Sequence, residues 1–222
     1  MALSKRRERL EAHHTAYRIT ELRLNPVRGK FDAAHLKEIN RRIFQDLPAL
    51  GFADVSPGDY RPALAPGNDW IKVRRLETVD ASSNVAYSAM DKAARVRLDQ
   101  ALQDANPIKL AQLKLAEFVK MLGKLYVEID YIHPFSDGNS RTLREFTREL
   151  AEVSGYCIEW ERFDESPAGR DLLYIARDLS VNKLALPHIQ HAGTKRDVVL
   201  SMDQFEGNRD LPDLLRDVIH KM

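Results

Sequence analysis

Hydrophobic residues recur at helical spacing along most of this chain. Between residues 32 and 47 they follow one another at Leu36, Ile39, Ile43 and Leu47. This spacing places them on one face of a helix, and Asp32 can cap its first turn. We therefore predict a mainly α fold in which most helices bury one face. Further helical patterns cover residues 3–23, 89–104, 108–132, 140–154, 167–191 and 197–221.

Strand patterns are confined to one short part of the chain. Residues 48–69 are rich in Pro, Gly and Asp, which is typical of irregular structure. After them residues 70–73 alternate like a short strand, and residues 84–87 are a suitable partner. Residues 156–160 are ambiguous between helix and strand. The sequence thus predicts at most one small β element, within residues 60–88.

The helical pattern over residues 108–132 has an unusually wide apolar surface. Its apolar side chains spread over more than half of the circumference, and the polar strip is Glu117, Lys120 and Lys124. A helix with so wide an apolar arc is usually covered by other helices on several sides. We expect it to lie centrally and to support His133, which follows it directly.

Composition excludes some classes of partner. The chain has 34 basic and 33 acidic residues and a net charge of +1. This balance gives no general attraction to nucleic acid or to an anionic membrane, so we expect neither as a partner. The single cysteine, Cys157, allows no disulfide within the chain, which is compatible with a reducing compartment. We expect a cytoplasmic protein; delivery by a signal-independent secretion machine remains open.

Residues 133–140 have the composition of an anion-binding turn. Pro134 disfavours helical geometry at His133, and Phe135 is suited to plug the turn into the core. Gly138 permits backbone conformations that other residues avoid, and Asn139 or Ser140 can cap a new helix. A glycine-containing turn that opens a helix directs backbone N–H groups at one point. The segment therefore predicts a site for an anion.

The helix that follows carries its positive charge on one side. Arg141, Arg144 and Arg148 fall within about 60° of one another on a helical wheel. Positive charge in the first turns opposes the helix dipole, which indicates that an anion compensates it. A polyphosphate would do so. The apolar residues Leu143, Phe146, Leu150 and Val153 fall on the opposite side.

Two further groups in this segment are suited to phosphate chemistry. Asp137 offers the oxygen ligand that Mg²⁺ prefers when the ion also binds phosphate oxygens. His133 ordinarily titrates near neutral pH and can accept a proton from an attacking hydroxyl. Each residue alone is commonplace. Together, at this spacing, they predict a nucleotidyl-transfer or phosphoryl-transfer site.

Residues 133–144 resemble the signature of the Fic (filamentation induced by cAMP) family, H-P-F-x-[D/E]-G-N-G-R-x-x-R. They match it throughout except at Ser140, where the signature has glycine. The resemblance extends over about residues 30–190 and implies a Fic-type helical bundle with a small β-hairpin flap. It implies a Fic domain at residues 31–195 with its flap within 60–88, an N-terminal helical extension at 1–30 and a C-terminal helix at 196–222.

The resemblance also implies an activity, which is the transfer of AMP from ATP to a Ser, Thr or Tyr hydroxyl of a target protein with release of pyrophosphate. His133 would be the base, and Asp137 would hold Mg²⁺ against the phosphates. The target protein would dock on the flap by strand pairing. The nucleotide would be bound by Gly138, Asn139, Ser140, Arg141 and Arg144.

The resemblance raises the question of inhibition. Many family members carry an inhibitory helix with the motif [S/T]-x-x-x-E-[G/N]. Residues 201–207 miss its spacing by one residue, and residues 4–9 end in arginine instead of Gly or Asn. We therefore expect inhibition by a separate small antitoxin-like protein, as suits a bacterial toxin.

Other functions remain open at this point. A kinase like the Doc branch of the superfamily would transfer the γ-phosphate, and Ser140 leaves room for this reading. The donor is alternatively another nucleotide, such as UTP, or a phosphocholine compound. A non-enzymatic module that binds nucleotide or peptide is a third possibility.

Overall fold

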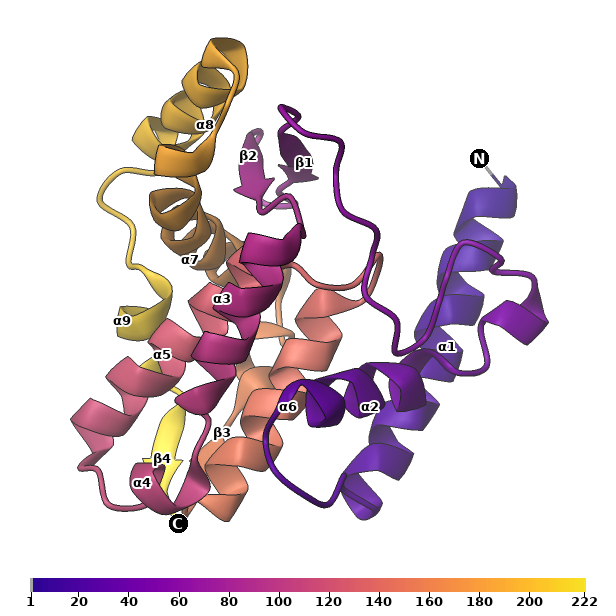
Figure 1. Ribbon diagram of the computed structural model, residues 1–222, viewed down its shortest axis with the longest axis vertical. Helices are drawn as coiled ribbons and strands as arrows, with labels where there is room; N and C mark the ends of the chain where they lie inside the picture. Colours follow the sequence, from indigo (N-terminus) through magenta and orange to yellow (C-terminus); the bar gives the residue numbers. More distant parts are fainter. Residues whose placement is uncertain (1) are drawn as a thin grey trace.

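Helices dominate the fold (Figure 1). The computed structural model describes the backbone of residues 2–222 and the side chains from Lys5 onward. In this part of the chain strands form only two small two-stranded sheets, which confirms the mainly α prediction. The prediction of at most one small β element is wrong, because the second sheet lies outside residues 60–88. Short 3-10 helices are η1 (Pro48–Leu50), η2 (Trp160–Phe163) and η3 (Leu186–His188). The α-helices are α1 (Ala2–Leu24), α2 (Ala33–Phe44), α3 (Lys92–Gln103), α4 (Pro107–Leu110), α5 (Leu115–Ile132), α6 (Asn139–Val153), α7 (Pro167–Ala185), α8 (Ala192–Gln204) and α9 (Leu211–Leu215).

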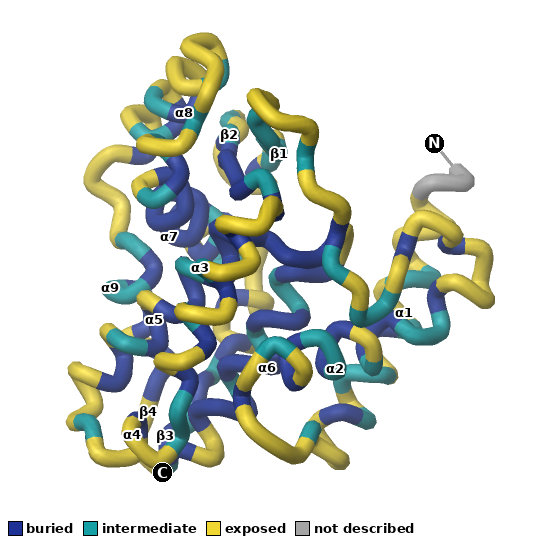
Figure 2. The backbone as a smooth tube through the Cα atoms, viewed as in Figure 1, coloured by how far each residue is buried: buried dark blue, intermediate teal, exposed yellow. Residues whose placement is uncertain are grey.

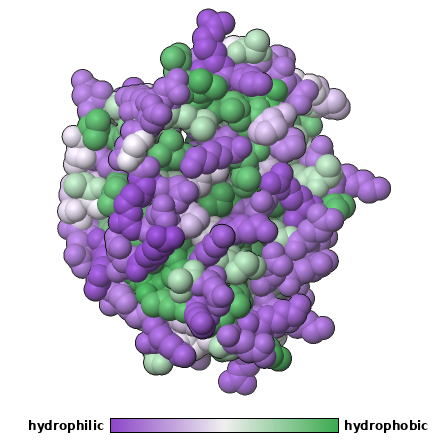
Figure 3. Space-filling view, turned by 90° about the vertical axis from the view of Figure 1, so that its left-hand side faces the viewer, coloured by the Kyte–Doolittle hydropathy of each residue, from purple (hydrophilic) through white to green (hydrophobic). Residues whose placement is uncertain are grey.

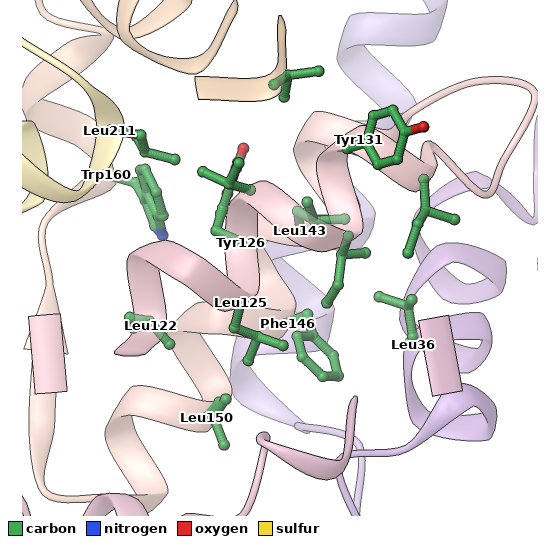
Figure 4. Close-up of a cluster of buried hydrophobic side chains, with 14 of the residues drawn as sticks. Leu36, Leu122, Leu125, Tyr126, Tyr131, Leu143, Phe146, Leu150, Trp160 and Leu211 are labelled. Atoms are coloured by element: carbon green, nitrogen blue, oxygen red, sulfur yellow. The ribbon is translucent and has the colours of Figure 1, made fainter. Parts of the chain in front are cut away.

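Helix α5 is the centre of the bundle, as its apolar pattern predicted. It packs against α3, α6, α7 and α9, and its middle is buried (Figures 1 and 2). Figure 4 shows Leu125 of α5 close to Phe146 of α6, with Trp160 beside Tyr126. The predicted polar strip of Glu117, Lys120 and Lys124 is exposed. The helix thus holds the segment that follows Ile132 on a rigid support.

Helix α5 begins later than the sequence predicted. Residues 108–132 do not form one helix, because α4 ends at Leu110 and α5 starts at Leu115. The Glu117 carboxylate accepts the backbone N–H of Lys114 at 3.0 Å, which caps the new helix. The carbonyl of Leu113 accepts the hydroxyl of Tyr156 and lies outside the helix. These two side-chain bonds replace the backbone bonds of a continuous helix.

The predicted hairpin is confirmed and is fixed to α7. Strands β1 (Trp70–Arg75) and β2 (Ser82–Tyr87) pair antiparallel, with Trp70 opposite Tyr87. Asp171 of α7 accepts backbone N–H groups from the turn that joins the strands. Asn182 of α7 binds the backbone of β2 from its other edge. The hairpin therefore has a defined position over the end of α5.

The C-terminal segment corrects the prediction of one helix at residues 196–222. It forms α8, α9 and strand β4 (Ile219–Lys221), which pairs with β3 (Tyr156–Ile158). Gly207, with a φ of 84°, lies in the turn after α8, and Asp210 caps α9. Helix α7 likewise ends at Ala185, because a proline follows Leu186. The periodic pattern continues across these breaks, which is why it suggested longer helices.

None of the helices in the described part of the chain is both long and apolar enough to cross a bilayer. Figure 3 shows hydrophilic residues over most of one face, with hydrophobic groups gathered in limited areas.

Val153, which the helical wheel placed on the buried side of its helix, is 65% exposed because it lies in the last turn of α6.

Candidate active site at the start of α6

The turn between α5 and α6 is anchored at its first residues. His133 has a φ of 50°, and its N–H still bonds the carbonyl of Ile129 at 3.0 Å. This left-handed conformation ends α5 sharply and is uncommon for a residue other than glycine. Phe135 is 1% exposed and bridges to Tyr60, which confirms its predicted role as a plug.

The second half of the turn is closed by Asn139 and requires glycine at position 138. The amide of Asn139 donates to the carbonyl of Phe135 at 2.8 Å and accepts its N–H at 3.0 Å. Gly138, with a φ of 72°, is the N-cap of α6. A Cβ at this position would lie 1.9 Å from Cζ of Phe44 in α2. The predicted cap at Asn139 or Ser140 is thus wrong, because the Asn139 side chain is engaged within the turn.

A buried arginine joins this turn to the hairpin. Arg61 is 5% exposed, and its guanidinium donates to the carbonyls of His133 at 2.7 Å and Ser88 at 2.6 Å. A third bond, to Ile132 at 3.2 Å, caps the carbonyl end of α5. Burial lowers the pKa of Arg61 to about 10, so it stays charged at neutral pH. The end of β2 and the turn are therefore held by one group.

The imidazole of His133 is enclosed and has a defined chemical state. Its ring lies 3.9 Å from that of Tyr87 and meets Trp70 edge-on. Nδ1 is 3.6 Å from Oδ1 of Asp130, and Nε2 is 3.1 Å from Nζ of Lys72. Burial lowers the pKa of His133 to about 4, although Asp130 opposes this shift. At neutral pH the ring is uncharged, with Nε2 able to accept a proton.

His133 borders a strongly basic cavity of about 520 Å³. Five of the residues around it are basic and two are acidic, so its field attracts anions. The first turn of α6 adds backbone N–H groups that have no partner within the helix. The geometry thus agrees with the predicted anion site. The cavity is lined by Lys72, Arg74, Tyr87, His133, Asp137, Gly138, Asn139, Ser140, Arg141, Arg144, Asp164, Tyr174 and Arg177.

Both predicted phosphate-binding arginines are paired with carboxylates. Arg141 bonds Glu11 of α1 at 2.5 Å and the hydroxyl of Thr15 at 3.1 Å. Arg144 bonds Asp164 at 2.7 Å. An anion in the cavity would therefore have to compete with a carboxylate for each arginine. Arg148, the third arginine of the predicted face, is paired with Glu161 at 2.7 Å.

Asp137 is suited to a metal only together with a ligand in the cavity. Its side chain is 52% exposed, and Oδ1 accepts the N–H of Gly138 at 2.6 Å. The described residues contain no group of three or more side chains that could hold a metal ion alone. Mg²⁺ commonly binds one or two carboxylates, waters and substrate phosphates. A single carboxylate beside an anion cavity fits that mode.

Sequence reasoning missed part of the site. Asp130 stands three residues before His133, and helical spacing predicts their proximity. Lys72 belongs to the predicted strand, but nothing in the sequence aims it at His133. Arg177 and Glu11 come from distant helices and carry no local signal. The inhibitory-motif candidate at residues 201–207 has another role, since the hydroxyl of Ser201 accepts the N–H of Asn84 in β2. The other candidate begins at Ser4, whose side chain lies outside the described residues.

Comparison with known proteins identifies the family. Residues 30–151, more than half of the chain, match the Fic/DOC family. This chain is a member of the Fic/DOC family. The protein adenylyltransferase VbhT of Bartonella schoenbuchensis is 30% identical over 166 residues, which cover 74% of this chain and 30% of VbhT. Fic of Escherichia coli, described as a probable protein adenylyltransferase, is 26% identical over 72% of this chain and 69% of its own length. The chain thus spans less than a third of VbhT.

Solved structures share the fold. The effector BepC from Bartonella tribocorum, with bound AMPPNP, has a TM-score of 0.61 and 16% identity, covering 98% of this chain and 88% of its own. The N-terminal Fic domain of a Bartonella quintana effector, with bound ADP, has a TM-score of 0.57 and 20% identity, covering 98% and 86%. At such identities the likeness shows the fold alone, and it confirms the Fic-type bundle.

Proposed function

We propose that this chain transfers AMP from ATP to a hydroxyl of a target protein. The observation that carries the proposal is an uncharged His133 with its Nε2 directed at Lys72, at the edge of a basic cavity built on the start of α6. Such a cavity suits a polyphosphate, and a neutral imidazole suits proton abstraction from an attacking hydroxyl. The relatives' names as protein adenylyltransferases support the same reading.

The proposed reaction assigns a step to each group. Nε2 of His133 accepts the proton of the target hydroxyl, whose oxygen forms a bond to the α-phosphorus of ATP. The bond from that phosphorus to the bridging oxygen of the β-phosphate breaks, and pyrophosphate leaves. Arg141 and Arg144 exchange Glu11 and Asp164 for the outer phosphates. Backbone N–H groups of residues 139 and 140 bind the phosphates of the nucleotide, and that of Gly138 joins them by leaving Oδ1 of Asp137.

Lys72 must move for this reaction. In the structure its ammonium group occupies the lone pair of Nε2 that the target hydroxyl needs. A phosphate oxygen in the same cavity would give the ammonium group another partner, and there it would offset the charge of the transferred group. Asp137 would hold Mg²⁺, which would neutralise phosphate charge when bound.

The target would lie along the hairpin. In the described part of the chain β1 pairs with β2 alone, so its other edge is open to an added strand. Strand pairing there would bring a Ser, Thr or Tyr side chain toward His133. We further propose a bacterial toxin in the cytoplasm that is restrained by a separate small antitoxin-like protein; co-purification with the product of the neighbouring reading frame tests this.

Label transfer tests the activity. Protein and Mg²⁺ are incubated with cell lysate and with ATP labelled at either the α- or the γ-phosphate. We expect protein labelling from α-labelled ATP only, its loss in His133→Ala, and its retention in the matched surface variant His13→Ala. Labelling from the γ-phosphate would support a Doc-like kinase instead. Labelling from UTP or a phosphocholine donor alone would change the donor, and ATP binding without any transfer would favour a binding module.

A further inference from the structure

Ser140 is held by a buried arginine. Its side chain borders the cavity, and its Oγ lies 3.0 Å from Nη1 of Arg177 in α7. The side chain of Arg177 is only 2% exposed. Because a guanidinium can only donate, Oγ must accept this bond. The residue that departs from the family signature is therefore part of a hydrogen-bonded arrangement and is not a passive substitution.

The same arginine is anchored on Asp130. Three hydrogen bonds of 2.8–3.0 Å join its guanidinium to both carboxylate oxygens. Asp130 is 1% exposed, and its Oδ1 also lies 3.6 Å from Nδ1 of His133. One buried carboxylate therefore faces Nδ1 of the base at 3.6 Å and reaches the phosphate-binding turn through Arg177.

The direction of the Ser140 hydroxyl follows from this arrangement. With Arg177 occupying a lone pair of Oγ, the hydroxyl hydrogen remains for another acceptor. On the buried side Tyr126 interacts with Ser140, and a tyrosine hydroxyl can donate to the second lone pair of Oγ. A phosphate oxygen bound at the start of α6 would supply the acceptor.

The energetics of the pair favour a role beyond the fold. A fully buried ion pair contributes little net stability, and apolar residues of similar size are often equally stable in its place. Removing one member alone is costly, however, because the other charge stays buried. Stability alone therefore does not account for this pair. Its position between His133 and the phosphate-binding turn indicates a role in the reaction.

We propose that Asp130 and Arg177 are positioning residues for the transfer reaction. Asp130 fixes the proton of His133 on Nδ1, and Arg177 turns the Ser140 hydroxyl toward a phosphate oxygen of the nucleotide. This inference rests on the proposed function, since it assumes that a nucleotide occupies the cavity. The inference adds a direct contact between the nucleotide and Ser140, the one residue that differs from the family signature.

A double-mutant cycle tests whether Arg177 acts on the nucleotide through Ser140. AMPPNP affinity, with Mg²⁺ present, is measured by calorimetry for wild type, Ser140→Ala, Arg177→Lys and the double variant. Lysine keeps the positive charge opposite Asp130 but loses the planar guanidinium that binds Asp130 and Ser140 at the same time. We expect about tenfold weaker binding for each single variant, as for a hydrogen bond to a charged group, and no further loss in the double variant. Ser140→Thr, which keeps the hydroxyl, should bind like wild type.

The outcomes separate the inference from the function. Wild-type binding with no loss in Ser140→Ala, or losses that multiply in the double variant, would overturn the Arg177 arm while leaving the function standing. No binding of AMPPNP by the wild type would refute the proposed function itself.

Nitrogen NMR tests the arm through Asp130. We expect the imidazole ¹⁵N shifts of His133 to report a proton on Nδ1, both in the wild type and in Lys72→Ala. Lys72 also favours this tautomer by donating to Nε2, so the variant isolates the effect of Asp130. A proton on Nε2 in Lys72→Ala would overturn this arm. A merely structural role for Asp130 does not predict which nitrogen carries the proton.

Discussion

Replacing Gly138 by alanine should destabilise the protein for two separable reasons. The φ of 72° is costly for a residue with a Cβ, by about 1–2 kcal/mol. The new Cβ would also lie 1.9 Å from Cζ of Phe44, whereas carbon atoms ordinarily approach to about 3.5–4.0 Å. Phe44 is 1% exposed, so its ring must move by more than an ångström within a packed core. Overpacking of this kind costs about 1–3 kcal/mol, and the sum is about 2–5 kcal/mol.

Urea unfolding can separate the two contributions. Gly155 has a φ of 84° with no atom within 4 Å of its would-be Cβ, so Gly155→Ala should show the backbone cost alone. In a Phe44→Leu background the collision at position 138 is removed, and Gly138→Ala should again cost only about 1–2 kcal/mol. Equal costs for Gly138→Ala in both backgrounds would refute the steric argument. A cost of Gly138→Ala in the wild-type background that is no larger than the cost of Gly155→Ala would do the same.

Three further predictions concern charge. Lys72→Met should raise the pKa of His133, because the ammonium charge lowers it. The acid limb of the pH profile of kcat/KM should then move to higher pH. An unchanged acid limb would contradict the effect of Lys72 on His133. Glu11→Gln should tighten AMPPNP binding about fivefold, because the anion no longer has to replace an ion pair with Arg141 worth about 1 kcal/mol. Glu21→Gln on the same helix should leave the affinity unchanged. Calorimetry measures both affinities. Burial of neutral His133 should lower stability as pH falls from about 6.5 toward 4, because only the unfolded state takes up the proton there. The loss approaches about 3 kcal/mol, and urea midpoints should depend less on pH in His133→Gln.

Features set by local pattern could be predicted from the sequence. The periodicity of Leu36 to Ile43 and the cap at Asp32 define α2, and two bonds at the N-cap bear this out. The alternation after Trp70 identifies the hairpin. The composition of residues 133–144 predicts an anion-binding turn, and seven of these residues line one basic cavity in the structure. Each signal is contained within about a dozen residues.

What escaped prediction depends on contacts between distant segments. Strands β3 and β4 have three residues each and are separated by about sixty residues, so neither has a period of its own. Arg177 reaches Asp130 only because α7 crosses α5, and Glu11 reaches Arg141 only because of where α1 packs. Even the breaks after Leu110 and Gln204 come from side-chain caps and a glycine turn within patterns that continue past them.

The anchored hairpin has a consequence for how a target would be recognised. Its turn is tied to Asp171, the adjoining end of β1 to Asp178 through Arg74, and the residue after β2 to Arg61. A template held at three points loses little conformational freedom when a strand is added, so the entropic cost of docking falls on the incoming segment. Selection among targets would then favour sequences that are already extended and exposed, such as loops and termini, over segments that must first unfold from a helix.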